Sequence, residues 1–233
     1  MPTLVFVSPK GGAGKTTSAL VLASQIAKQA PVTVIDADPN HPIKTWATGE
    51  NTPKNFIVIS DTNEETIADR IDEAAAQTPF VIVDLEGTAS KIVVMAVSRA
   101  DFVIVPTQGS ELDAEQAGKA LHVIRQHEKS MRRVNPGYSL PYSVLLTRTN
   151  AVIRARTLTH IQKSMLEAGI PVFKTELNER EAFKAMFSFR QPLEHLPSSA
   201  VANVDKAITN ADAFMKEVIG CLSETKTDAI ASS

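Results

Sequence analysis

The chain has 233 residues, of which 43% are hydrophobic and 21% are charged, and its formal net charge is −2. This composition is typical of a globular protein with a full core, and it excludes a protein whose whole surface is basic. The single cysteine, Cys221, excludes a disulfide framework within the chain and a four-cysteine metal site.

The N-terminal residues lack the basic start and the long apolar stretch of a signal peptide. No run approaches the roughly 18 apolar residues that a membrane-spanning helix requires. We therefore expect a cytoplasmic protein.

Apolar, β-branched runs alternate with helix-like runs along the chain. Strands are predicted at residues 3–7, 32–36, 56–60, 80–84, 101–106, 142–147 and, as a short one, 171–175. Helices are predicted over residues 18–29, 111–130, 156–168, 179–187 and 199–220, and another opens near residue 62. Such alternation is typical of a parallel sheet covered on both faces. We predict one doubly wound, mostly parallel α/β domain over residues 1–222 and a flexible tail at 223–233.

A glycine-rich run, S-P-K-G-G-A-G-K-T-T, lies at residues 8–17 between the first strand and the first helix. At such a junction the backbone amides and the helix dipole favour an anion, and glycines let the backbone wrap a phosphate chain. In the general P-loop pattern Lys15 reaches the β- and γ-phosphates and Thr16 places its hydroxyl on Mg²⁺. Pro9 stands where that pattern has its first glycine, so the run fits K-G-G-x-G-K-T-T better, with Lys10 as an additional charge.

This run resembles the deviant Walker A motif of the ParA/MinD family of ATPases. Three further segments match in the same order. They are V-I-D-A-D-P-N at 34–40, F-V-I-V-D-L-E-G at 80–87 and the strand and helix at 101–121. The resemblance spans roughly residues 1–195 and implies a P-loop fold, ATP as substrate and Mg²⁺ as cofactor. No guanine-reading N-K-x-D run is visible, which favours ATP over GTP.

The resemblance also implies roles for individual residues. ATP is sandwiched between two subunits in this family, and Lys10 would reach the phosphates bound by the partner subunit. Asp38 would position the attacking water and Asp36 would support the outer shell of the metal, while Asp84 would hold Mg²⁺ through water. The expected nucleotide-binding residues are Gly11, Gly12, Ala13, Gly14, Lys15, Thr16, Thr17 and, beside adenine, Thr147.

The segment after Asp84 departs from the family pattern. Many relatives have prolines there, whereas this chain has Leu85, Glu86, Gly87 and Thr88. Gly87 still gives the backbone the freedom that a γ-phosphate sensor requires. Glu86 is interpreted as a solvated charge of the switch loop.

The charge of the chain is unevenly distributed. Residues 121–190 contain 12 Lys and Arg against 5 Asp and Glu, whereas residues 1–120 contain 9 against 15. A solvated helix face explains such a basic segment, and so does nonspecific DNA binding through phosphate contacts. By resemblance to ParA-type relatives, Arg156, Arg180 and Lys184 are the expected DNA-binding residues.

The remaining expectations concern cargo and partner. The final predicted helix is not basic, which argues against membrane docking of the MinD type. The chain starts at its first strand, as in the short ParA subtype, which implies a ParA-type partition ATPase that is nucleoid-associated when ATP-bound. The implied partner is a ParB-like centromere-binding or adaptor protein that stimulates hydrolysis. A VirC-type ATPase of conjugative DNA transfer, a positioning ATPase for another cargo, a biosynthetic ATP-using enzyme and a regulatory protein that holds ATP are the alternatives.

Overall fold

The computed structural model describes residues 1–9, 11–86, 91–152 and 155–231. The strands are β1 (Thr3–Phe6), β2 (Val32–Ala37), β3 (Phe56–Ile59), β4 (Phe80–Leu85), β5 (Phe102–Thr107), β6 (Tyr142–Thr149) and β7 (Leu177–Asn178). The helices are α1 (Lys15–Ile26), α2 (Pro42–Trp46), α3 (Ile67–Gln77), α4 (Lys91–Val97), α5 (Glu111–Met131), α6 (Arg156–Glu167), α7 (Glu181–Phe189), the 3₁₀ turn η1 (Leu193–His195) and α8 (Val204–Ala231).

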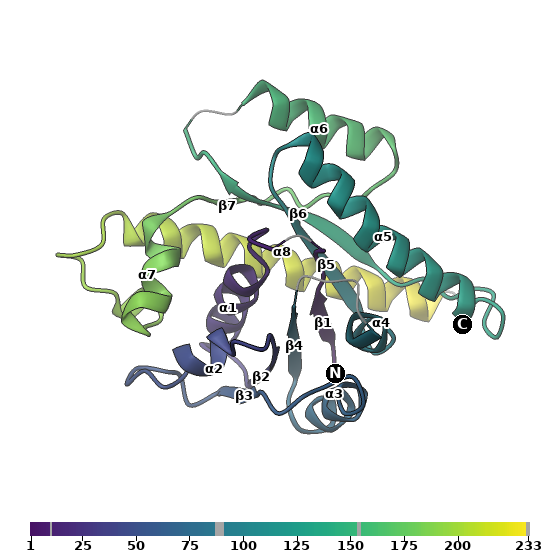
Figure 1. Ribbon diagram of the computed structural model, residues 1–233, viewed down its shortest axis with the longest axis horizontal. Coiled ribbons are helices and arrows are strands. Elements are labelled where there is room, and N and C mark those ends of the chain that lie inside the picture. Colours follow the sequence, from purple (N-terminus) through teal and green to yellow (C-terminus); the bar gives the residue numbers. More distant parts are fainter. Residues whose placement is uncertain (10, 87–90, 153–154, 232–233) are drawn as a thin grey trace.

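The strands form one seven-stranded sheet in the order β3-β2-β4-β1-β5-β6-β7. Every pairing among the described strands is parallel. Helices cover both faces of the sheet (Figure 1). The predicted doubly wound α/β fold is confirmed.

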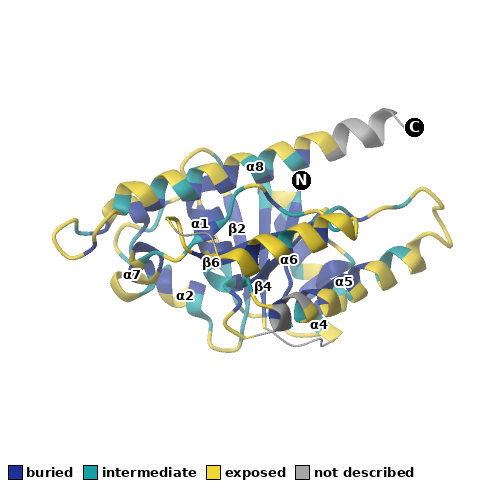
Figure 2. Ribbon diagram, turned by 90° about the horizontal axis from the view of Figure 1, so that it is seen from above, coloured by how far each residue is buried: buried dark blue, intermediate teal, exposed yellow. Residues whose placement is uncertain are grey.

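Alternating side chains of the strands build two cores, one on each face of the sheet. Leu4 and Phe6 of β1 point into the core shared with α1, α2, α7 and α8. Val5 points into the opposite core, which is shared with α3, α4, α5 and α6. Figure 2 shows α8 along one side of the buried strands and α5 and α6 along the other.

The strand order indicates which edge of the sheet binds a ligand. β1 lies between β4 and β5, so the chain winds in opposite directions on its two sides. In such sheets ligands bind at the carboxyl ends of the strands beside this reversal point. Phe6 of β1 pairs with Asp84 of β4, and Asp84 pairs with Asp36 of β2. The glycine-rich run and both aspartates therefore meet at one edge.

The structure differs from the predicted elements in several places. The short helices α2 and α4 were not predicted. The strand expected at 171–175 is reduced to a single bridge between Val172 and Val144, and the paired residues are Leu177 and Asn178 instead. Helix α8 continues to Ala231 and so includes most of the segment expected to be a flexible tail, whose flexibility stays a prediction.

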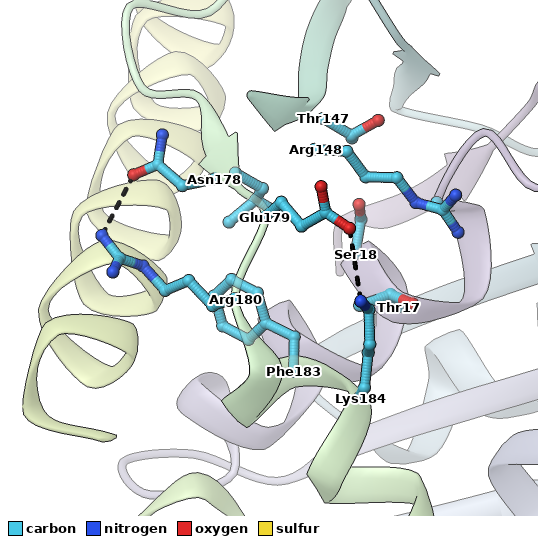
Figure 3. Close-up of a pocket in the computed structure, with 11 residues that line it drawn as sticks. Thr17, Ser18, Thr147, Arg148, Asn178, Glu179, Arg180, Phe183 and Lys184 are labelled. Atoms are coloured by element: carbon cyan, nitrogen blue, oxygen red, sulfur yellow. Dashed lines mark hydrogen bonds and ion pairs between the residues drawn. The ribbon is translucent and has the colours of Figure 1, made fainter. Parts of the chain in front are cut away.

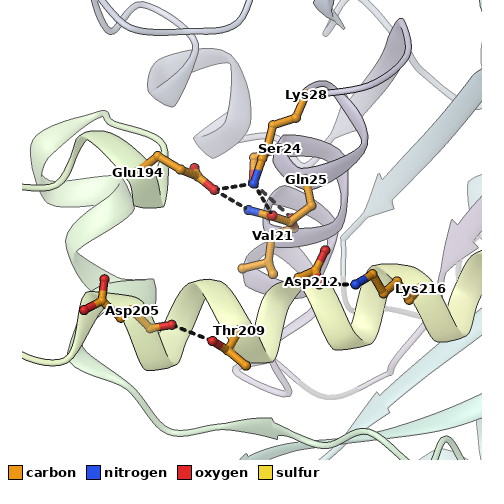
Figure 4. Close-up of polar contacts among 9 residues, drawn as sticks. All are labelled: Val21, Ser24, Gln25, Lys28, Glu194, Asp205, Thr209, Asp212 and Lys216. Atoms are coloured by element: carbon orange, nitrogen blue, oxygen red, sulfur yellow. Dashed lines mark hydrogen bonds and ion pairs between the residues drawn. The ribbon is translucent and has the colours of Figure 1, made fainter.

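The loop after α7 is fastened to both α1 and α2. Trp46 of α2 donates its indole N–H to the carbonyl of Gln191 (3.2 Å), and Asn51 donates to the Gln191 side chain (2.8 Å). On the other side, Glu194 of η1 accepts hydrogen bonds from Gln25 of α1 (3.2 Å) and from Lys28 (2.8 Å) just after α1, as Figure 4 shows. These contacts of the loop fix the C-terminal end of α7 relative to α1 and α2.

We predict that Gly49→Ala destabilises the protein. A Cβ at this position would overlap the carbonyl oxygen of Arg190, so the loop after α2 would have to move away from the loop after α7. The free energy of unfolding should fall by about 1 to 3 kcal/mol, as for other overpacked sites. Urea unfolding followed by circular dichroism measures the change.

Gly118→Ala in α5 is the matched control. A Cβ there meets nothing within 4 Å, so the variant should gain about 0.5 to 1 kcal/mol from higher helix propensity. Equal stability of the two variants would contradict the proposed close approach of the two loops.

Candidate functional site

The glycine-rich run turns sharply into α1. Gly12 has φ +79° and Gly14 has φ +91°, in the region that side chains disfavour, and Gly14 is the N-terminal cap of α1. A Cβ at Gly14 would meet Thr147 at 3.4 Å, so strain and crowding act together there. Four orphan amides at the start of α1 and the helix dipole make this turn a place for an anion.

Neighbouring strands brace the turn. The hydroxyl of Thr147 donates to the carbonyl of Ala13 (2.8 Å), and Gln108 donates from its side-chain amide to the carbonyl of Gly12 (2.8 Å). Thr147 is buried and Ala13 points into the core. The Thr147 hydroxyl, expected beside the base, is thus occupied in holding the phosphate loop.

A cavity of about 420 Å³ opens above the turn. It collects most of the residues expected to touch the phosphates, together with Glu86 and Arg148. Its lining is Pro9, Gly11, Gly12, Gly14, Lys15, Thr16, Thr17, Asp38, Glu86 and Arg148. Burial lowers the pKa of Lys15, and the nearby carboxylates, Asp84 first among them, partly offset this. Segments distant in sequence therefore converge on a space that suits a chain of phosphates.

Asp84 is fully buried at the floor of this region. Both of its carboxylate oxygens are buried and have no hydrogen-bond partner among the described residues. Burial raises the pKa of Asp84 to about 7, and the charge of Asp36 adds to the rise, whereas Thr16 and Lys15 oppose it. Orphan carboxylate oxygens beside a threonine are suitable donors for Mg²⁺ and its waters, since this ion takes few protein ligands besides phosphate oxygens.

Asp36 has one carboxylate oxygen committed to structure. Its Oδ2 accepts from the backbone amides of Ile43 (2.9 Å) and Lys44 (2.8 Å) in the first turn of α2. Burial raises the pKa of Asp36, and these two amides lower it in part. Its Oδ1 is buried and has no partner in the described part of the chain. Only Oδ1 thus remains for the predicted outer-shell role.

Asp38 begins the loop between β2 and α2. Its Oδ1 accepts from the backbone amide (2.8 Å) and the side-chain amide (3.1 Å) of Asn40. The loop is therefore a side-chain-stabilised turn, and Asp38 still lines the phosphate cavity. The turn interpretation and the catalytic interpretation are compatible.

A second, smaller cavity of about 60 Å³ adjoins the first. The two share three lining residues, and the smaller one is mostly apolar, with Leu177 and Phe183 in its wall. Its lining is Gly14, Thr17, Ser18, Thr147, Arg148, Leu177, Asn178, Glu179, Arg180, Phe183 and Lys184, most of them shown in Figure 3. We name it the base cavity, because a flat apolar space next to a phosphate site suits a nucleobase.

Arg148 belongs to both cavities, although the sequence had placed it only in the basic segment. It has φ +54° and lies between Thr147 and Thr149, which pair with the consecutive residues Leu177 and Asn178. This extra residue in β6 is a β-bulge, and bulges re-aim side chains near functional sites.

The predicted DNA-binding residues do not lie together. Arg180 and Lys184 line the base cavity, where Arg180 donates to Asn178 (3.1 Å) and Lys184 pairs with Glu179 (3.2 Å). Arg156 begins α6 and lines a separate groove beside Ser110 and His160. Among the described residues Arg156 has no ion-pair partner.

Three residues named in the sequence analysis fall outside the described residues. They are Lys10 and, in the loop after Asp84, Gly87 and Thr88. Within the described part of the chain, no cluster of three or more histidine, cysteine or acidic residues could hold a metal ion by itself. In the same part, no helix is both long and apolar enough to cross a membrane.

Comparison with known proteins shows the family of the chain. The family model described as VirC1 protein matches residues 1–227. Protein ParA of Rhizobium radiobacter is 37% identical over 225 residues, 96% of this chain and 99% of that protein. Protein virC1 of Rhizobium rhizogenes is 29% identical over 192 residues, 80% of each chain.

Solved structures share the fold at lower identity. Cyanothece McdA in complex with ATP superposes with a TM-score of 0.72 at 18% identity, covering 94% of this chain and 96% of that one. MinD of Pyrococcus horikoshii, complexed with Mg-ADP, gives 0.70 at 14% identity, covering 93% and 95%.

We predict that Asp84→Asn stabilises the protein without ligand at pH 8. A pKa of about 7 in the folded state exceeds the value of about 4 expected in the unfolded chain, so the folded state holds its proton to higher pH. The contribution of Asp84 to stability is therefore complete below pH 4 and is lost as pH rises to 7. The variant should gain about 2 to 4 kcal/mol at pH 8 and about nothing at pH 4.

Urea unfolding at pH 4, 5, 6, 7 and 8, without nucleotide or Mg²⁺, gives the difference between the two proteins. The control is Asp72→Asn, an exposed carboxylate paired with Arg99, which should change stability by less than about 1 kcal/mol at every pH. A difference between Asp84→Asn and the parent protein that does not grow with pH would refute the buried-charge account.

Proposed function

Because the chain belongs to the VirC1 family and is a ParA-type member of the ParA/MinD P-loop ATPases, we propose that it is a partition ATPase. It binds Mg²⁺-ATP and forms a dimer with the nucleotide between the subunits. The dimer binds DNA nonspecifically and releases the DNA after ATP hydrolysis. One observation carries this proposal. The braced glycine turn, Lys15 and Asp38 line a phosphate-sized cavity that continues into a base cavity, and Asp84 is buried close to Lys15.

The phosphates of ATP are placed on the turn at residues 11–17. Backbone amides of the turn and the Lys15 ammonium bind them, and Arg148 adds a second positive charge from the opposite side of the cavity. Thr16 and Asp84 would hold Mg²⁺, and Asp36 would support its outer shell. The bound ion would neutralise charge on the β- and γ-phosphates. The adenine lies against Leu177 and Phe183.

Hydrolysis requires an oriented water and stabilisation of the charge that develops on the phosphoryl oxygens. Asp38, which reaches the phosphate cavity from its stabilised turn, orients the water. Lys10 of one subunit contacts the phosphates bound by the other, so the complete site exists only in the dimer. Hydrolysis is therefore slow until the dimer forms and a partner protein, of ParB-like or adaptor type, stimulates it.

DNA binding is assigned first to Arg156. Its side chain is exposed and lines the groove between α6 and the loop before α5, so it can reach a phosphate backbone. Arg180 and Lys184 are assigned to DNA only by resemblance to ParA-type relatives, and both line the base cavity. The ATP-bound protein would then be cytoplasmic and nucleoid-associated.

A VirC-like role in conjugative DNA transfer is the second candidate. The match of the VirC1 model to nearly the whole chain favours it, whereas the higher identity to a protein named ParA favours partition. Both roles use the same nucleotide chemistry and differ in the DNA complex that is moved. Co-purification of the tagged protein with a centromere-binding protein or with a transfer-origin complex separates them.

We predict that Lys10→Ala binds ATP as a monomer but does not dimerise. The P-loop of the same subunit is intact in this variant, so its affinity for ATP should stay within about threefold of the parent value. Sedimentation with a slowly hydrolysed ATP analogue measures the association. Lys15→Ala should lose ATP binding, and Asp38→Ala should bind ATP and accumulate as a dimer. An ATP-dependent dimer of Lys10→Ala would refute the shared site.

We predict that DNA binding requires both ATP and Arg156. With the ATP analogue the protein should bind DNA of any sequence, and affinity should fall by about tenfold or more between 50 and 200 mM salt. Arg156→Ala should weaken DNA binding and leave the dimer intact. The measurement is fluorescence anisotropy of labelled duplex DNA with no nucleotide, ADP, ATP or the analogue.

Arg99→Ala is the control for that experiment, because Arg99 is an exposed arginine outside the basic segment that pairs with Asp72. It should bind DNA as the parent does. If the protein dimerises with ATP and ignores DNA, the basic segment is a solvated surface and the partition role is wrong.

A further inference from the structure

One wall of the base cavity comes from a stretch of chain that has few sheet partners. Residues 173–180, here named the wall segment, run from the end of the Val172 bridge through β7 to the start of α7. Leu177 and Asn178 pair with β6, and the backbone amides of Phe173 and Glu179 donate to the carbonyls of Val144 and Thr149 in β6 (both 2.9 Å). The wall segment contributes Leu177, Asn178, Glu179 and Arg180 to the cavity. The sheet thus holds both ends of the wall segment, whereas backbone groups of residues 174–176 between them bond elsewhere.

Helix α8 supports the wall segment with three side chains. Glu217 accepts the backbone amides of Lys174 and Thr175, both at 2.7 Å. Asn210 donates to the carbonyl of Glu176 (2.7 Å) and accepts from the backbone amide of Asn178 (3.1 Å). These four hydrogen bonds serve backbone groups of the wall segment, as a neighbouring strand would.

The third contact is aromatic and lies between the two polar ones. Phe214 meets Phe173 edge to face, with ring centroids 5.6 Å apart, and both side chains are buried. Positions 210, 214 and 217 are four and three residues apart, so they share one face of the helix. The contact between Phe214 and Phe173 is enough to pack α8 against the wall segment. The hydrogen bonds of Asn210 and Glu217 therefore add a function other than packing.

Asn178 transmits this support into the base cavity. Its backbone amide is held by Asn210, while its side chain donates to Thr149 (2.9 Å) and accepts from the guanidinium of Arg180 (3.1 Å). Figure 3 shows Asn178 and Arg180 joined at the edge of the cavity, with Glu179 pointing toward Ser18. The orientation of Arg180 thus depends on Asn178, and the position of Asn178 depends on α8.

We propose that Asn210 and Glu217 are positioning residues for the nucleoside part of ATP. They hold the wall segment against the base and sugar, so α8 sets the affinity for the nucleoside without touching the nucleotide. This inference rests on the proposed function, because it assigns the base cavity to the base of ATP. It also predicts selectivity, since the lining of the phosphate cavity includes no residue of the wall segment.

The test separates the nucleoside from the phosphates. Binding of an ATP analogue and of inorganic tripolyphosphate, each with Mg²⁺, is measured by calorimetry on the full chain. Asn210→Ala should bind the ATP analogue about tenfold more weakly, as expected for the loss of anchoring hydrogen bonds, and should bind tripolyphosphate within about twofold of the parent value. A general loss of structure would weaken both ligands together.

Three further variants keep the test decisive. Asn210→Asp keeps the acceptor for the Asn178 amide but places a carboxylate oxygen against the Glu176 carbonyl, to which Asn210 donates, so it should not restore the affinity for the ATP analogue. Glu217→Gln should show the same selectivity as Asn210→Ala with a smaller loss, about threefold, because one carbonyl acceptor remains. The control is Thr209→Ala, whose hydroxyl bonds within α8 to the carbonyl of Asp205, as Figure 4 shows. It should change neither affinity.

The outcomes distinguish this inference from the proposed function. If Asn210→Ala, and likewise Glu217→Gln, binds both ligands as the parent does, or loses both in parallel, the positioning role is wrong while the ATPase proposal stands. If the parent protein itself binds tripolyphosphate no more weakly than the ATP analogue, the assignment of the base cavity fails. If the parent binds neither ligand, the proposed function fails as well.

Discussion

The site depends on two carboxylates that are buried side by side. Asp36 and Asp84 occupy paired positions on β2 and β4 and are both fully buried. Burying two like charges is unfavourable unless hydrogen-bond donors or opposite charges stabilise them. Here the two carboxylates have different stabilising partners. Asp36 takes two amides of α2, and Lys15 stands near Asp84, whose oxygens keep no hydrogen-bond partner among the described residues. The residual imbalance makes this position receptive to a cation, so the ligand preference of the site originates in the sheet.

The same arrangement ties the site to a distant part of the molecule. Asp36 holds the first turn of α2, and Trp46 at the other end of α2 bonds to Gln191 just after α7. Helix α7 in turn contributes Phe183 and Lys184 to the base cavity. The Asp38 loop therefore lies between two fixed points, and it cannot move far unless α2 moves or the amides release Asp36. A change at the phosphates is in this way mechanically connected to the wall of the base cavity.

Sequence patterns predicted the parts of this protein that depend on local chemistry. Buried strands are continuous apolar runs, and a phosphate loop requires glycine, lysine and threonine at fixed spacing, so the sheet and the residues at 11–17 were recognisable. Helix α2 was not predicted, because its five residues form through capping by Asp36, which lies earlier in the chain. The place of Arg148 in both cavities was not predicted, because the bulge that carries it depends on strand pairing. Support from Asn210 was equally invisible, since its partners lie 32 and 34 residues away.

The P-loop chemistry is common to proteins that move different cargoes, so selection of the cargo has to depend on surfaces that respond to the loop. One such connection is direct. Gln108 holds Gly12 of the phosphate turn, and a Cβ at the next residue, Gly109, would lie 2.5 Å from the side chain of Leu158 in α6. Leu158 is two residues beyond Arg156, the residue to which we assign DNA contact. The phosphate turn and the start of α6 are thus connected by a single short loop. A shift of the turn would reach the start of α6, and with it the proposed DNA surface, through this loop.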